Sequence, residues 1–173
     1  FGATSESPEL FRQATEVDPD YAPAWAASAV AVVYLRESAF WDGMQAEEVF
    51  AMAQEYIDRA LALDPDLAEA YVAESALHWD RYRFVDALAA IDRALALNFS
   101  LAVAHLERSR VLESLGRIDE ANRSLLTAAE LDPLDLGILM RAIDMARDYR
   151  DLALLEEVEQ RLTKLDSMQA KNL

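Results

Sequence analysis

A short string recurs along the chain at nearly constant spacing, and this repeat limits the possible folds more than any other feature. The five copies are EVDPD (16–20), LALDPD (61–66), LALNFS (95–100), AELDPL (129–134) and the weaker TKLDSM (163–168). The residue that follows the Asp or Asn of each string serves as a ruler: Pro19, Pro65, Phe99, Pro133 and Ser167. Successive rulers are 46, 34, 34 and 34 residues apart. We infer four consecutive copies of one structural unit, the first of which carries an insertion of 12 residues.

Positions counted from the ruler hold the same kind of side chain in successive units, at helical spacing. Small residues stand twelve before the ruler and ten after it: Ala53, Ala87 and Ala121, and Ala29, Ser75 and Ser109. Two antiparallel helices approach to about 8–10 Å only where side chains are small. We therefore expect these two sets to meet where paired helices cross. Asp-Pro ends a helix, because the residue before a proline is pushed out of helical geometry.

These patterns predict a chain of helices with no strands. The expected helices span residues 8–17, 22–34, 45–62, 67–81, 84–96, 101–115, 118–130, 135–148 and 152–165. Asp66 with Glu69 is typical of a capping box, and Ser100 of a simple N-cap. Gly116 suits the C-terminal end of a helix.

The sequence resembles the tetratricopeptide-repeat family, most clearly over LESLGRIDEANRSLLTAAELDP (112–133) and more broadly over residues 8 to 166. The resemblance implies an all-α fold, a right-handed superhelix of antiparallel helix pairs. It divides residues 1–173 as a single array: a half repeat (8–18), repeats at about 20–65, 66–99, 100–133 and 134–167, and a short C-terminal tail. Leu155, Glu159 and Leu162 depart from the family pattern, which favours a capping last helix.

Catalytic and metal-binding chemistry is poorly represented. Absence of cysteine excludes disulfides, thiolate zinc sites and cysteine nucleophiles, and two histidines are too few for a multi-histidine metal site. His78 and His105 stand in columns that hold packing residues in other units. The neighbours Glu47 and Glu48, like Glu156 and Glu157, point in different directions on a helix and indicate solvated faces. We expect no enzyme activity, no cofactor and no metal.

Charge and hydropathy restrict the partners. Thirty-two acidic against sixteen basic residues give a net charge of −16, which disfavours nucleic acid. The longest apolar stretch, 24–35, is shorter than the roughly 20 residues of a membrane-spanning helix, so no membrane insertion is expected. The absence of cysteine leaves the compartment open between cytoplasm, taken as the default, and periplasm. The chain begins at Phe1 rather than Met, so we expect it to be a fragment whose upstream sequence is not visible.

In the resembled family, the first helix of each unit lines a concave groove, and this implies where a partner would bind. The matching positions lie seven, eleven, fourteen and fifteen residues after each ruler. The candidates chosen there are Val30, Val33, Tyr34, Val72, Ala76, Trp79, Leu106, Arg110, Met140 and Arg147. Val33 and Trp79 are the expected apolar anchors, and Arg110 and Arg147 the expected contacts to a carboxylate or carbonyl.

The leading hypothesis is a non-catalytic protein–protein interaction scaffold that binds a partner peptide or helix in this groove. The alternative is a regulatory or sensor domain of a larger bacterial signalling protein, such as a cyclase or transcription regulator. Two further features stay open. The insertion at 36–45, with Phe40 and Trp41, either packs on the first helix pair or contacts a partner. The N-terminal half repeat implies a missing upstream unit or self-association into a homo-oligomer.

Overall fold

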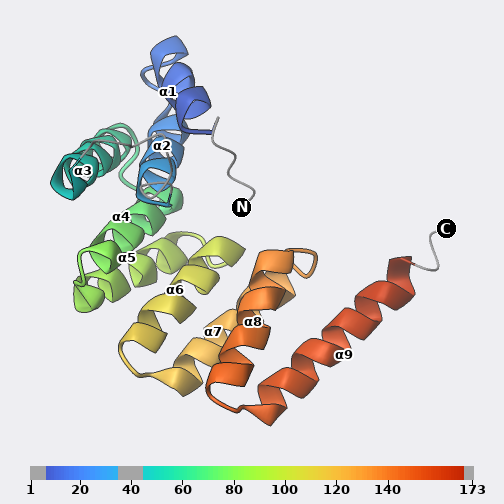
Figure 1. Cartoon of the computed structure of the whole chain (residues 1–173). Helices are drawn as coiled ribbons and strands as arrows, with labels where there is room; N and C mark the ends of the chain where they lie inside the picture. The colour runs from blue at the N-terminus through green and yellow to red at the C-terminus, as the bar shows by residue number, and fades with distance from the viewer. Residues whose placement is uncertain (1–6, 35–44, 170–173) are drawn as a thin grey trace. The chain divides into compact units, whose positions relative to one another are not determined.

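The computed structural model describes residues 7–34 and 45–169, and every element in these ranges is an α-helix (Figure 1). The helices are α1 (Ser7–Val17), α2 (Ala22–Tyr34), α3 (Ala46–Leu63), α4 (Ala68–Asp80), α5 (Phe84–Leu97), α6 (Ala102–Ser114), α7 (Ile118–Leu131), α8 (Leu136–Asp148) and α9 (Leu152–Gln169). The predicted all-α fold class is confirmed, and every predicted helix is present. Except for Gln45, the insertion at 36–45 lies outside the described residues, as does the packing of Phe40 and Trp41.

The chain divides into two units, Phe1–Phe99 and Ser100–Leu173. The division coincides with the predicted boundary between the second and third full repeats. The continuity of one array across this boundary stays a prediction.

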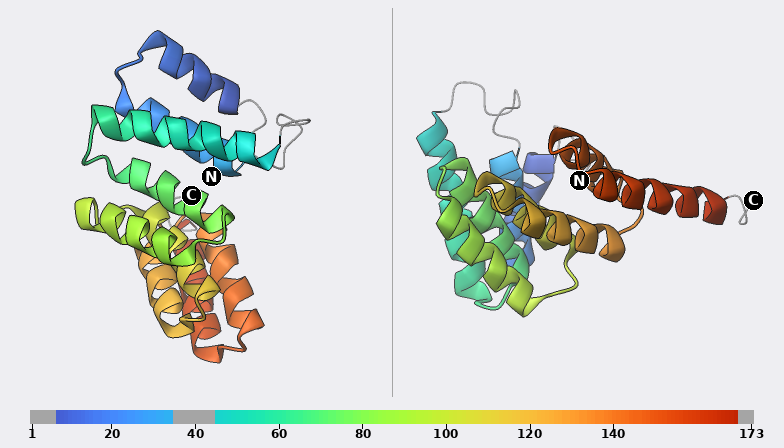
Figure 2. Two further views of the ribbon diagram at one scale, coloured as in Figure 1. Left: turned by 90° about the vertical axis from the view of Figure 1, so that its left-hand side faces the viewer. Right: turned by 90° about the horizontal axis from the view of Figure 1, so that it is seen from below.

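In the first unit, α2 pairs with α3 and α4 pairs with α5, while α1 packs on α2 and α2 on α4 (Figure 2). The predicted crossings of small residues lie in the core. Ala29, Ala53, Ser75 and Ala87 are all fully buried, and Ala29 and Ala53 belong to one apolar cluster. Burial without a bulky side chain lets each helix pair close tightly.

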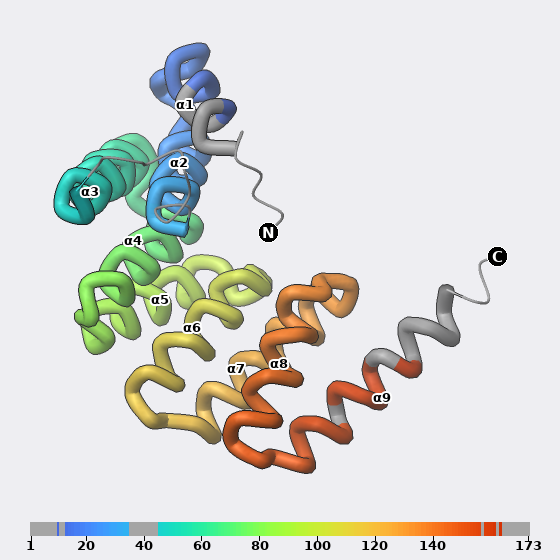
Figure 3. Tube along the Cα trace, viewed as in Figure 1, coloured from blue at the N-terminus to red at the C-terminus, as the bar shows by residue number. Residues whose placement is uncertain are grey.

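The second unit contains α6 paired with α7 and α8 paired with α9, with α7 also packed on α8 (Figure 3). Its buried side chains include Leu112, Leu125, Leu139, Met145 and Val158. The hydroxyl of Ser109 on α6 lies 3.8 Å from the sulfur of Met145 on α8, so the first helices of these two hairpins touch. The predicted small residue Ser109 is fully buried at this contact.

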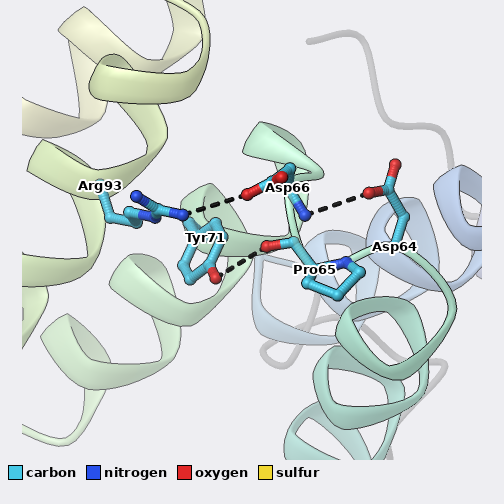
Figure 4. A network of polar contacts seen from close by, with 5 residues as sticks. All are labelled: Asp64, Pro65, Asp66, Tyr71 and Arg93. Carbon is cyan, nitrogen blue, oxygen red and sulfur yellow. Dashed lines mark hydrogen bonds and ion pairs between the residues drawn. The ribbon is translucent and has the colours of Figure 1, made fainter.

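A network of polar side chains holds the turn between α3 and α4 (Figure 4). The carboxylate of Asp64 accepts a hydrogen bond from the backbone N–H of Asp66 at 3.0 Å. The hydroxyl of Tyr71 donates to the carbonyl of Pro65 at 3.0 Å, and Arg93 on α5 donates to Asp66 at 3.1 Å. The guanidinium of Arg93 also lies over the Tyr71 ring, 5.8 Å from its centroid. One side-chain network therefore ties α5 to the turn between α3 and α4.

The expected caps at Asp66 and Ser100 are wrong by one position. Helices α4 and α6 begin after Leu67 and Leu101, whose side chains accept no capping hydrogen bond. Asp66 lies in the turn itself, where Arg93 engages its carboxylate. A capping box is found instead at α3, where the N–H of Gln45 donates to the carboxylate of Glu48 at 2.8 Å. In the second unit, Asp135 caps α8 by accepting from Gly137 N–H at 2.7 Å.

The turn inside each hairpin also repeats. Gly116 has a φ of +73° at the end of α6, and the next N–H, of Arg117, donates back to Leu112 at 2.9 Å, which confirms the predicted helix end. Tyr82 and Arg150 occupy the same left-handed region, with φ of 59° and 54°. They stand 34 residues before and after Gly116. A backbone geometry that favours glycine is thus held by larger residues in two of the three turns described.

Candidate protein-interaction surface

The first unit buries part of the predicted groove. Val33, Val72 and Ala76 are buried, and Val33 and Ala76 belong to the same core cluster as Phe50 and Leu77. The expectation that these three side chains face a partner is therefore corrected. Helix α2 is apolar around most of its circumference, and a helix of that kind is enclosed on several sides. Val30 also packs against this cluster, but it is only partly buried.

Tyr34 and Trp79 are the predicted residues of the first unit that keep accessible surface. Tyr34 is exposed, and Trp79 is half-buried. The Trp79 ring lies 6.3 Å from Phe84, and Phe84 lies 6.1 Å from Tyr82. Sequence reasoning missed Tyr82 and its neighbour Val85, which are both strongly exposed beside this aromatic group. Their positions fall outside the groove columns of the repeat, so the repeat pattern does not select them.

In the second unit, an exposed stripe runs along one side of α8. Leu136 is 68% exposed and Met140 64% exposed, while Asp144 and the exposed Arg147 continue the stripe. Steps of four, four and three residues place these four side chains on one side of a helix. We call this set the α8 face. Met140 and Arg147 were predicted; Leu136 was missed, although its spacing from Met140 would have revealed it.

The opposite side of α8 is firmly packed. Ile138, Leu139, Ala142 and Met145 are all buried. The exposure of Leu136 and Met140 therefore belongs to a helix that is held in place, not to a loose end. Leu106 on α6, another predicted residue, is half-buried.

The arginines expected to hold a partner's carboxylate already contact carboxylates of this chain. Arg110 donates to Glu107 at 2.7 Å, and Glu107 is only 3% exposed. Arg147 pairs with Asp144 one turn before it. An incoming carboxylate would have to displace Glu107 or Asp144, and displacement from a buried group such as Glu107 carries a desolvation penalty. The structure therefore weakens the expectation that Arg110 is an open anion contact.

A third pair joins the two helices that flank this surface. Arg141 on α8 donates to Glu113 on α6. Tyr149, which follows α8, lies close to the same carboxylate. Burial, followed by the charge of Glu113 and a hydrogen bond to it, raises the pKa of the Tyr149 hydroxyl. This network fixes α6 against α8 and leaves its charges largely balanced.

The histidines and paired glutamates have structural surroundings. His105 is buried, and His78 is half-buried at the end of α4, where burial and the nearby Arg83 lower the pKa of its imidazole. Glu47 pairs with Arg81 at 3.1 Å, and Glu48 caps α3. Glu156 is exposed on α9. Glu157 lies within α9, and its side chain is not described.

Within ranges 7–34 and 45–169, no group of three or more His, Asp or Glu side chains is placed to hold a metal ion. None of the helices in the same ranges combines the length and apolar character needed to cross a bilayer.

Comparison with known proteins identifies the fold. No protein-family model matches the sequence, and no curated protein matches it significantly. Among solved structures, a thermophilic tetratricopeptide-repeat protein of Thermus thermophilus superposes with a TM-score of 0.67 at 21% identity, over 82% of this chain and 72% of that one. The tetratricopeptide-repeat protein YrrB, described as having an unusual peptide-binding site, gives a TM-score of 0.55 at 18% identity, over 96% and 82%.

A further likeness is to the first tetratricopeptide-repeat domain of Spaghetti (RPAP3), solved with the HSP90 peptide SRMEEVD. The TM-score is 0.54 at 16% identity, over 71% of this chain and 94% of that one. At these identities the likeness concerns the fold. It agrees with the 34-residue period, the buried small residues and the paired helices described above. The chain has the tetratricopeptide-repeat fold, as its sequence repeat predicts.

Proposed function

We propose that this chain is a non-catalytic protein-interaction module, and that the α8 face binds a segment of a partner protein. The observation that carries the proposal is the exposure of Leu136 and Met140 on one side of a helix whose other side is fully packed. Covering apolar surface of this kind with a partner releases water and stabilises the complex by about 25 cal/mol per Å² of apolar area. Leu106 and Arg110 of α6 belong to the same proposal as predicted neighbours.

The fold supports this class of function. Two of the similar structures are described with a bound peptide or with a peptide-binding site. Both have the same paired-helix fold as this chain, and an extended or helical segment of a partner protein is the kind of ligand proposed for such a surface. The alternative of a regulatory domain in a signalling protein is not favoured by these likenesses.

Tyr34 and Trp79 are proposed as a separate contact region of the first unit. A Trp79→Ala variant tests this region, since the half-buried ring makes its described contact with Phe84 at the helix end. We expect weaker partner binding with little change in melting temperature. A large fall in melting temperature would assign Trp79 to the core instead.

The main test is selection of binders from a displayed library of random twelve-residue peptides, using the full chain as bait. Met140→Asp places a carboxylate on the α8 face and should lower the affinity for the selected peptides by about 10-fold or more. A methionine side chain that becomes buried on binding contributes about 1.5–3 kcal/mol to the binding free energy. Leu152→Asp is the matched control, since Leu152 is similarly exposed but lies at the start of α9. Peptides whose affinity does not depend on Met140 would contradict the proposal.

A further inference from the structure

The α8 face changes character along its length, and this gradient bears on what it binds. Leu136 and Met140 make its first half apolar. Asp144 and Arg147 make its second half polar, and the exposed Asp148 follows Arg147 as the last residue of the helix. The last turn of a helix carries a partial negative charge from its unpaired carbonyl groups, so Asp148 adds a carboxylate where the helix is already negative.

Charge balance singles out Asp148. The three nearby arginines are matched by carboxylates of the chain: Arg110 by Glu107, Arg141 by Glu113 and Arg147 by Asp144. Arg150 follows in the turn, and in the described part of the chain no ion pair joins it to Asp148. Asp151 comes directly after Arg150. With Asp148, Asp151 and Arg150 counted, five carboxylates stand against four arginines, so the surplus at this end of α8 is one negative charge, within a chain whose net charge is −16.

We propose that the α8 face takes a partner segment with one apolar side chain and one lysine or arginine, the cation lying against Asp148. The proposal rests on the proposed function and names its class of ligand. An acidic segment is disfavoured for two reasons. The surplus negative charge repels it, and Arg110, Arg141 and Arg147 are already paired with carboxylates of the chain. The apolar side chain lies on Leu136 and Met140.

Helix geometry sets the spacing in the ligand. Met140 and Asp148 are eight residues apart, which is about 12 Å along a helix that rises 1.5 Å per residue. An extended peptide advances about 3.3 Å per residue, so a segment lying along α8 spans this distance in three or four residues. The expected motif is therefore an apolar residue and a basic residue three or four positions apart.

The test uses a displayed library of twelve-residue peptides with leucine fixed at the centre and the other positions random. Three baits are compared: the unchanged chain, Asp148→Lys, and Glu156→Lys. Glu156 is an exposed carboxylate on α9, so the last variant changes the net charge equally at another site. Asp148→Lys should fold normally, because a cation suits the end of a helix, and its melting temperature is measured to confirm this.

We expect the unchanged chain and Glu156→Lys to enrich lysine and arginine three or four residues from the leucine. Asp148→Lys should lose this enrichment or favour Asp and Glu instead. For one synthetic peptide of each selected type, exchange of its lysine for glutamate should weaken binding to the unchanged chain about two- to fivefold, the scale of losing an exposed ion pair. The same exchange should strengthen binding to Asp148→Lys.

Two results would overturn the inference, and only the second would also overturn the proposed function. Selected peptides that depend on Met140 but show no basic preference, or the same preference with Asp148→Lys, would refute the ligand class and leave the proposed function standing. Failure to obtain any peptide whose binding depends on Met140 would refute both.

Discussion

The hydroxyl of Tyr71 donates a hydrogen bond to the carbonyl oxygen of Pro65, 3.0 Å away, across the turn between α3 and α4. The indole N–H of Trp25 does the same to Pro19, at 2.9 Å, across the turn between α1 and α2. Both donors stand six residues after the proline they reach. In both turns, the aromatic residue six positions after the proline therefore fastens the turn by a side-chain hydrogen bond.

Removing this hydrogen bond should cost measurable stability. Tyr71→Phe keeps the ring and its contact with Arg93 but deletes the donor. We expect the free energy of unfolding to fall by about 0.5–1.5 kcal/mol, the usual net value of one hydrogen bond. Urea denaturation followed by circular dichroism measures it. Tyr82→Phe is the control, because Tyr82 is 82% exposed, and an equal loss in both variants would contradict the interpretation.

The left-handed residue Arg150 offers a stabilising substitution. Its φ of 54° strains any residue with a Cβ atom, and Gly116 shows the residue that the same turn accepts without strain. We expect Arg150→Gly to raise the free energy of unfolding by about 0.5–1 kcal/mol, after the greater flexibility of glycine in the unfolded chain is subtracted. Chemical denaturation at low and high salt separates this gain from any charge effect.

The reverse substitution is the matched test of the same turn. A Cβ atom at Gly116 would meet nothing within 4 Å, so Gly116→Ala changes only the backbone strain. Its φ of +73° should make the variant less stable by about 1 kcal/mol. Opposite signs at Arg150 and Gly116 are expected, and equal signs would show that the three turns are not equivalent.

The close helix crossing at Ala87 should resist enlargement. Ala87 is fully buried on α5, and Ser75, which is also fully buried, lies on the helix paired with it. Ala87→Leu adds three carbons where no space exists and should lower the free energy of unfolding by about 1–3 kcal/mol. Ala89 is exposed on the same helix, so Ala89→Leu should have little effect. Thermal melting of the two variants side by side decides the matter.

Much of the fold follows from the sequence, because a 34-residue period repeats the same packing problem in every unit. Ala53, Ala87 and Ala121 are fully buried as predicted, and Gly116 ends its helix as predicted. The caps were placed less well. Asp66 has the chemistry of an N-cap, but a long-range partner on α5, Arg93, engages it in the turn. Local patterns do not reveal such a partner.

The candidate site was less predictable for a related reason. The groove columns assume that one side of each first helix stays open, and α2 is apolar on several sides, so Val33 is buried. At the other end of the chain, Met140 and Arg147 are exposed as the columns require. Arg110 was expected to bind a partner's carboxylate, but it already forms an ion pair with Glu107, three residues earlier. The carboxylate with which an arginine pairs depends on how deeply each group is buried, and that burial is known only from the folded chain.

Glu74 on α4 should make stability depend on pH. Burial first, and then the neighbouring charge of Asp58, raise the pKa of the Glu74 carboxyl, against the opposing pull of Arg83. A raised pKa means that the folded protein binds the proton more tightly than the unfolded chain. This contribution to stability is therefore present below the unfolded pKa and lost as the pH rises through the folded pKa.

Glu74→Gln mimics the protonated form and should stabilise the protein at pH 7 but hardly at about pH 4, near the pKa of an unperturbed glutamate. Urea denaturation at the two pH values measures the difference. Glu55→Gln, which neutralises an exposed carboxylate on α3, is the control variant. A gain for Glu74→Gln that is equal at both pH values would point to packing instead of charge.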